Sequence, residues 1–174
     1  GMQNADGGFA FWRRGDESWP YISIHAAHAL ERAKGKGFDV PAGMLDRSLK
    51  YMKNIEKQIP KWYPDSTRRT LIAYALYVRN RLGDRDPGRA RKLIKETGLE
   101  NLPLEAVGWL LPVLSNDPGS ARIVTAIRRH LENRVEETAG AAHFTTNYDD
   151  GAHLLLHSNR RTDGILLEAL IGDQ

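Results

Sequence analysis

Cysteine is absent from the 174 residues of this chain. Its absence excludes disulfide bonds, thiolate metal sites and a cysteine nucleophile. Long apolar runs are missing too, because no window approaches the roughly 18 apolar residues of a membrane span. No glycine loop with phosphate-binding spacing precedes an expected helix. We find no secretory leader after Gly1-Met2, which resembles a tag remnant ahead of a start methionine, so we expect a different native N-terminus.

The composition is that of a globular domain with a core of its own. Hydrophobic residues make up 41% and charged residues 27% of the chain. The formal net charge of +3 excludes a strongly acidic or strongly basic tail protein. We therefore expect residues 1–174 to form a single domain.

Residues 3–30 hold the most distinctive pattern. Gln3 precedes an Asp-Gly-Gly turn at 6–8, where glycine adopts a positive φ without a Cβ clash. The Gln3 amide can satisfy backbone groups that such a turn leaves unpaired. We expect the aromatic rings beside the turn to be buried, so that alanine at Trp12 or Trp19 would cost about 3–5 kcal/mol. These rings are Phe9, Phe11, Trp12 and Trp19.

Proline, glycine and Asp-Pro pairs divide the rest of the chain into about seven expected helices. Ser18 is the expected N-cap of the first helix, and Pro112 predicts a kink or early stop in the fifth. Ala-Leu pairs at 29–30, 75–76 and 169–170 recur in multiples of roughly 47 residues, which is typical of paired-helix repeats. The expected ranges are 20–35, 41–59, 66–82, 87–98, 103–114, 118–131 and from 159 onwards.

Between 139 and 158 the spacing of apolar residues changes from the helical repeat to alternation, which predicts a short β-hairpin near the C-terminus. Alternation at 142–148 leads to an Asp-Gly turn at 149–151, and 152–156 would be the returning strand. Nearer the centre of the chain, Trp62 and Tyr63 are expected to pack on the neighbouring helical layer.

Three stretches together resemble the toroid (thioester-containing) domain of the bacterial alpha-2-macroglobulins. Residues 3–12 carry Gln, then Gly-Gly-Phe and an aromatic, and Trp19 follows a charged loop. Residues 37–41 read Gly-Phe-Asp-Val-Pro, similar to the family's Gly-Tyr/Phe-x-Val-Pro step. Residues 158–171 resemble its Arg-Thr-Asp-Ala-Ile helix start. The centre of the chain fits the family more loosely.

The resemblance implies an all-α fold, part of an α/α toroid. Seven helices are too few to close a toroid of roughly twelve, which predicts a segment excised from a larger protein. It also implies a non-catalytic part of an endopeptidase inhibitor of the periplasm or cell envelope, which traps proteases after bait cleavage. Its partners would be target proteases and neighbouring macroglobulin-like domains, with no cofactor. Exposed apolar surface at the cut ends would favour self-association.

Other functions remain open at this stage. The family's thioester motif, Cys-x-Glu-Gln, lies upstream of the glycine turn, so this chain cannot carry covalent trapping. One alternative is a toroid enzyme, terpene cyclase-like or polysaccharide-acting. However, the cyclase Asp-x-Asp-Asp motif is absent, and so is the cysteine that a prenyltransferase zinc site needs. A second alternative is a helical-repeat module that binds proteins.

Histidines supply the candidate site residues. His25 and His28 lie three positions apart on one expected helix, so both could face one ligand, but no third metal ligand is evident. Five residues near the hairpin could form a metal or catalytic cluster, or they could be ordinary surface residues. We favour the second interpretation. Those residues are His143, Asp149, Asp150, His153 and His157, of which His153 and His157 would share a strand face. We therefore assign no catalytic, cofactor or metal residue.

A basic run spans the loop between the third and fourth expected helices. Acidic residues at 84, 86 and 96 interrupt it, so we expect a solvated helical face rather than a nucleic-acid site. Near the last helix, Arg160, Arg161 and Asp163 are expected to form a structural ion pair. The run consists of Arg79, Arg81, Arg85, Arg89, Arg91, Lys92 and Lys95.

Overall fold

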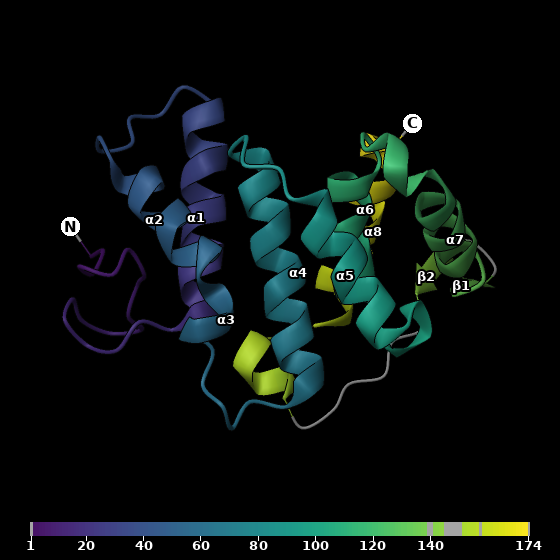
Figure 1. Cartoon of the computed structure of the whole chain (residues 1–174), viewed down its shortest axis with the longest axis horizontal. Helices are drawn as coiled ribbons and strands as arrows, with labels where there is room; N and C mark the ends of the chain where they lie inside the picture. The colour runs from purple at the N-terminus through teal and green to yellow at the C-terminus, as the bar shows by residue number, and fades with distance from the viewer. Residues whose placement is uncertain (1, 139–140, 145–150, 157, 174) are drawn as a thin grey trace.

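The computed structural model describes residues 2–138, 141–144, 151–156 and 158–173. Figure 1 shows α1, α4, α6 and α8 side by side, with α7 and the strand pair at one end. At the other end α2 packs on α1, and α3 contacts α2 and α4. The predicted all-α fold with a short β-hairpin is confirmed. The helices are α1 (Pro20–Gly35), α2 (Met44–Lys53), α3 (Ile55–Gln58), α4 (Asp65–Arg81), α5 (Pro87–Thr97), η1 (Leu99–Asn101), α6 (Leu104–Leu114), η2 (Pro118–Ser120), α7 (Ala121–Glu132), η3 (Ala152–Leu155) and α8 (Asn159–Gly172).

The core lies between α4 and α6. Every residue from 71 to 78 on α4 is buried, as is every residue from 104 to 111 on α6. Helices that are apolar on all sides in this way belong inside a domain. At Gly108 an added Cβ would lie 2.8 Å from Leu166 Cδ2, so the missing side chain lets α8 pack closely on α6. Among the described residues, no helix is long and apolar enough to cross a membrane.

Several helix ends agree with the sequence. The side chain of Asp86 accepts a hydrogen bond from the Arg89 amide at 3.0 Å, which confirms the predicted start of α5. Others were wrong. Ser18 is not the N-cap of α1, because its hydroxyl bonds with Asn4 and Asp6 instead. The predicted helix over 41–59 begins only at Met44, since Gly43 has φ +71°, and it is interrupted at Asn54.

The hairpin forms earlier in the chain than predicted. β1 (Val135–Thr138) pairs antiparallel with β2 (Ala141–Phe144), with Val135 opposite Phe144. The returning strand expected at 152–156 was wrong, because residues 152–155 form η3. The predicted turn residues Asp149 and Asp150 lie outside the described residues. Likewise, the Ala-Leu pair at 29–30 does not face the core, since Ala29 is exposed and Leu30 half-buried.

The N-terminal turn is held by polar bonds. The buried Gln3 amide donates to the Gly7 carbonyl at 3.0 Å and the Met44 carbonyl at 2.9 Å, and Arg47 Nε donates back to Gln3 Oε1 at 2.9 Å. Gly7 has φ +91°, and a Cβ there would lie 2.2 Å from the Arg47 carbonyl oxygen. The predicted role of Gln3 is therefore confirmed, and the turn is anchored on α2.

The predicted burial of the aromatic rings was mostly wrong. Phe9 is buried, but Phe11, Trp12 and Trp19 are 41%, 78% and 38% exposed. Phe11 contacts both tryptophans, with its ring centroid 4.7 Å from that of Trp12 and 5.6 Å from that of Trp19, and none of the three is buried in the core. Trp62 is also exposed, while its neighbour Tyr63 is buried. Of the four rings beside the turn, only Phe9 is therefore buried as predicted.

Candidate functional site

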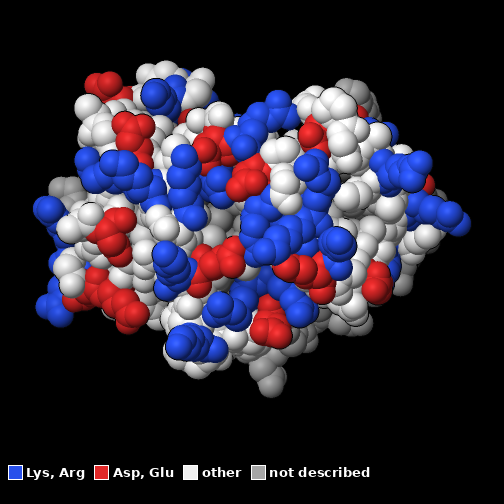
Figure 2. All heavy atoms as spheres, in the orientation of Figure 1, with Lys and Arg blue, Asp and Glu red and all other residues white. Residues whose placement is uncertain are grey.

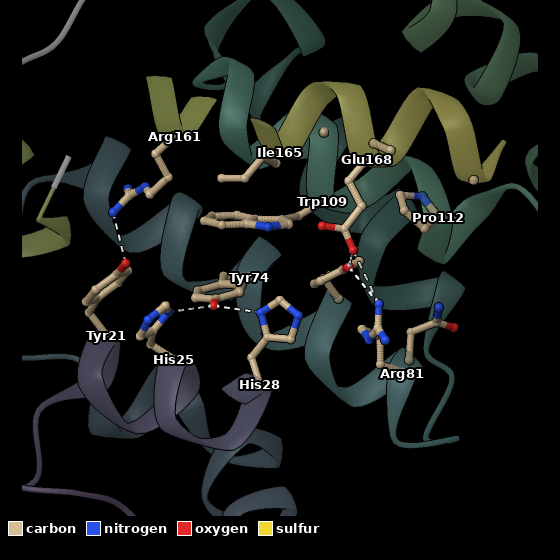
Figure 3. Close-up of a pocket in the computed structure, with 15 residues that line it drawn as sticks. Tyr21, His25, His28, Tyr74, Arg81, Trp109, Pro112, Arg161, Ile165 and Glu168 are labelled. Atoms are coloured by element: carbon tan, nitrogen blue, oxygen red, sulfur yellow. Dashed lines mark hydrogen bonds and ion pairs between the residues drawn. The ribbon is translucent and has the colours of Figure 1, made fainter. Parts of the chain in front are cut away.

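A cavity of about 310 Å³ opens between α1, α4, α6 and α8. Figure 3 shows its aromatic wall, with Trp109 from α6 above Tyr74 from α4. Their rings stack with centroids 4.0 Å apart and planes at 11°. Ile165 and Glu168 of α8 lie across from α1 and close the other side. The four helices of the central layer thus each supply part of one concave site.

Two predicted site residues, His25 and His28, meet at this cavity. Because they lie three apart on α1, both rings reach the Tyr74 hydroxyl, whose oxygen is 3.1 Å from His25 Nδ1 and 3.0 Å from His28 Nδ1. Figure 3 shows the hydroxyl between the two rings. Both Nδ1 atoms are therefore engaged in hydrogen bonds. Within the part of the chain that the structure describes, no three His, Cys, Asp or Glu side chains converge as metal ligands do.

Burial sets the protonation states of these groups. It lowers the pKa of His28 to about 4, with the positive charges of Arg81 and Arg32 acting in the same direction. Burial, together with the charge of Arg161, also lowers the pKa of His25. The pKa of the Tyr74 hydroxyl is raised well above its ordinary value, again mainly by burial. Near neutral pH the cluster is therefore uncharged, which suits hydrogen bonding and stacking better than proton abstraction.

A buried ion pair borders the cavity. Glu105 of α6 is 1% exposed, and its carboxylate accepts from Arg161 Nε at 3.0 Å and Arg161 Nη2 at 2.9 Å. Arg161 also donates to the Tyr21 hydroxyl at 2.9 Å, so the pair connects α1, α6 and α8. The predicted partner was wrong, because Asp163 accepts from the Phe144 amide instead. Sequence analysis missed Glu105, which lies 56 positions from Arg161 inside an apolar helix.

The opposite rim of the cavity carries a second set of ion pairs. Arg81 bonds Glu31 at 2.7 Å and lies 3.4 Å from Glu168, which also accepts from Arg32 at 2.9 Å. The Tyr77 hydroxyl donates to Glu168 at 3.2 Å. Each charged side chain on this rim therefore already has a partner of opposite charge.

Of the other candidate residues, the described part of the chain includes His143 and His153, whereas Asp149 and Asp150 lie outside it. His143 is exposed on β2 and His153 is exposed on η3, while His157 lies outside the described residues. Figure 2 shows blue and red side chains interspersed on one face, rather than an unbroken basic patch. Much of the predicted basic run is ion-paired, as expected for a charged helical face. The pairs are Arg79 with Asp84 and Asp86, Arg81 with Glu31, Arg89 with Glu56, and Arg91 with Asp117.

The sequence and the fold of this chain were compared with those of known proteins. No family model matches the sequence. Over 77 residues, 44% of this chain and 4% of the relative, it is 30% identical to an alpha-2-macroglobulin of Rickettsia conorii. A variant of Salmonella alpha-2-macroglobulin superposes on 97% of this chain with a TM-score of 0.77 and 20% identity. The predicted resemblance to bacterial alpha-2-macroglobulins is confirmed.

The solved alpha-2-macroglobulins are much longer than this chain. Native Escherichia coli alpha-2-macroglobulin matches 97% of it with a TM-score of 0.77 and 20% identity, and the chain spans 10% of that protein. The trypsin-activated form of the Escherichia coli protein matches 98% with a TM-score of 0.76 and 18% identity. At these identities the superpositions establish the fold, which fits the predicted toroid segment.

Proposed function

We propose that this chain is a structural segment of an alpha-2-macroglobulin-like endopeptidase inhibitor. The observation that carries the proposal is the match of nearly the whole chain to Salmonella and Escherichia coli alpha-2-macroglobulins. The sequence identity to the Rickettsia protein supports it independently. In this role the segment is part of a longer periplasmic or cell-envelope protein, and it packs against neighbouring macroglobulin-like domains.

The state of the cavity supports a scaffold rather than an enzyme. Its histidines are hydrogen-bonded and uncharged near neutral pH, and its arginines are paired with carboxylates. A hydrolase or cyclase needs a carboxylic acid or a base free to exchange a proton with substrate. The bonded groups instead join α1, α4, α6 and α8, which suits a rigid curved layer.

An immunoblot and a trapping assay test the proposal. An antibody raised against this chain should detect a polypeptide far larger than 19.6 kDa in an envelope fraction of the source cells. The purified full-length protein, incubated with trypsin, should abolish cleavage of casein while sparing cleavage of a small peptide substrate. Unchanged casein cleavage would refute the inhibitor role, and a band near 20 kDa would refute the longer parent.

A further inference from the structure

The exposed loop before α1 carries two consecutive arginines, Arg13 and Arg14. Every residue from 11 to 17 is exposed, and this stretch belongs to no helix or paired strand. Figure 1 shows the N-terminal loops outside the helical layer, beside α1 and α2. The side chain of Arg13 is 84% exposed, and Gly15 has φ +96° with open space where a Cβ would lie. Exposed loops of this kind are where endopeptidases cut folded proteins.

The position of this pair distinguishes it from the other basic pairs of the chain. Consecutive Lys or Arg residues occur at five places in the sequence, and at four of them the pair lies within a helix. An endopeptidase binds its substrate as an extended strand, which a helical residue provides only after the helix unfolds. Among the five, the pair at 13–14 can therefore enter an active site while the helices stay folded. The helical pairs are 68–69 on α4, 91–92 on α5, 128–129 on α7 and 160–161 on α8.

The side chain of Asn4 holds the loop on the C-terminal side of the two arginines. Its amide nitrogen donates to the Asp16 carbonyl at 2.8 Å and to the Ser18 hydroxyl at 2.9 Å, and its oxygen accepts from the Gly15 amide at 2.8 Å. The Gly15 and Asp16 backbone groups must leave these bonds before residues 13–16 can extend in an active site. Because such cleavage follows the population of the open loop, the Asn4 bonds should slow it.

The contacts that hold the N-terminal turn lie outside the loop and would survive a cut within it. Phe9 is buried, its amide donates to the Ser23 hydroxyl at 2.8 Å, and its carbonyl accepts from the Trp19 amide at 2.9 Å. The Gln3 amide donates to the Met44 carbonyl of α2 at 2.9 Å. A cut between Phe9 and Trp19 therefore leaves anchoring bonds on both sides.

We propose that the Arg14–Gly15 peptide bond is a cleavage site for endopeptidases that recognise two consecutive basic residues, and that the Asn4 side chain limits cleavage there. Carboxylates in the specificity pockets of such an enzyme would pair with the two guanidinium groups. Hydrolysis adds water across the bond, so that Arg14 gains a carboxylate and Gly15 gains an amino group. The site goes beyond the scaffold role and does not depend on it, because it follows from the exposure of this loop.

Digestion of the whole chain with kexin, an endopeptidase that cuts after paired basic residues, tests the proposal. Mass spectrometry of the folded chain should show an early cut after Arg14, while the four helical pairs stay intact. A synthetic peptide of residues 9–18 lacks the Asn4 bonds, so it should be cut faster than the loop of the folded chain.

Two variants and a control locate the effect. Arg14→Gln should abolish the early cut, because it removes the second basic residue. Asn4→Ala should speed the cut about 5–30-fold, the effect of one or two lost hydrogen bonds. Arg129→Gln, at an exposed position in the basic pair of α7, is the matched control and should leave the rate unchanged.

Two results for the unmodified chain would overturn the cleavage site, whether or not the variants fold. These are an early cut at one of the helical pairs, or no cut after Arg14 under conditions that digest the peptide of residues 9–18 completely. An unchanged rate in Asn4→Ala would overturn the role of Asn4.

Discussion

The N-terminal turn and the α4–α6 core use aromatic side chains in opposite ways. In the core, Tyr74 and Trp109 are buried and stacked at 4.0 Å. Beside the turn, Trp12 is 78% exposed, and the chain is held by the Gln3 amide and by the close approach of Gly7 to the Arg47 carbonyl. The hydrophobic effect thus stabilises the core, whereas directional hydrogen bonds position the turn.

The largest effect is expected in the core. Leu110→Ala at a 0% exposed position should lower the free energy of unfolding by about 2–5 kcal/mol, because it removes buried surface and leaves a void. Urea denaturation followed by circular dichroism measures this loss. Leu167→Ala, an exposed leucine of α8, is the matched control and should stay within about 0.5 kcal/mol. Equal losses for the two variants would contradict the assigned core.

A smaller effect is expected in the turn. Gln3→Ala should cost about 1–3 kcal/mol, since it leaves the Gly7 and Met44 carbonyls and Ser48 without the amide donor. Hydrogen exchange should show faster opening of residues 3–9 and the first turn of α2, with α6 unchanged. The half-buried Gln58 provides a control, Gln58→Ala. Loss of protection throughout α6 would show that the turn and the core unfold as one unit.

Acidification should weaken the core through His28. In the folded chain its pKa is about 4, against an ordinary 6.5, so the unfolded state takes up a proton first as the pH falls. The contribution of His28 to stability is therefore fully present above about pH 6.5 and falls by about 1–3 kcal/mol towards pH 4. Urea midpoints across this range measure the slope. His28→Phe should reduce this slope, while the lowered pKa values of His25 and His130 sustain the remainder. An unchanged slope in that variant would assign the whole effect to other groups.

The smallest effect is expected at the exposed ring of the turn. Trp12→Ala should change the free energy of unfolding by less than about 0.5 kcal/mol, because the side chain is mostly in solvent already. Thermal denaturation of this variant beside Leu110→Ala compares the two regions directly. A loss near 3 kcal/mol would restore the burial that the sequence suggested.

Local backbone chemistry explains why much of the fold could be predicted. Proline, glycine and the Asp86 cap act within a few residues, so the bounds of α1 and α5 could be predicted from the sequence. The start of α8 near Asn159 was also predicted. The hairpin was misplaced because alternation over 142–148 predicts a strand but does not show which segment pairs with it. The strand that pairs with β2 precedes it in the chain.

The candidate site was only half predictable. The three-residue spacing of His25 and His28 on one helix is visible in the sequence, but the Tyr74 hydroxyl that joins them comes from another helix. Glu105 reaches Arg161 across 56 positions, and nothing local marks that contact. Exposure of Trp12 was equally hidden, because a ring beside a turn can point either inward or outward.

The Tyr74 hydroxyl has a single hydrogen atom, yet it lies within hydrogen-bonding distance of both imidazoles. It can donate to one Nδ1, and the other ring must then supply its own proton to the oxygen. The two histidines consequently take opposite tautomers, and reversing one requires the hydroxyl to rotate and the other to reverse as well. The hydroxyl on α4 thus couples the tautomers of the two histidines on α1, so that a change of tautomer at one imidazole requires a change at the other.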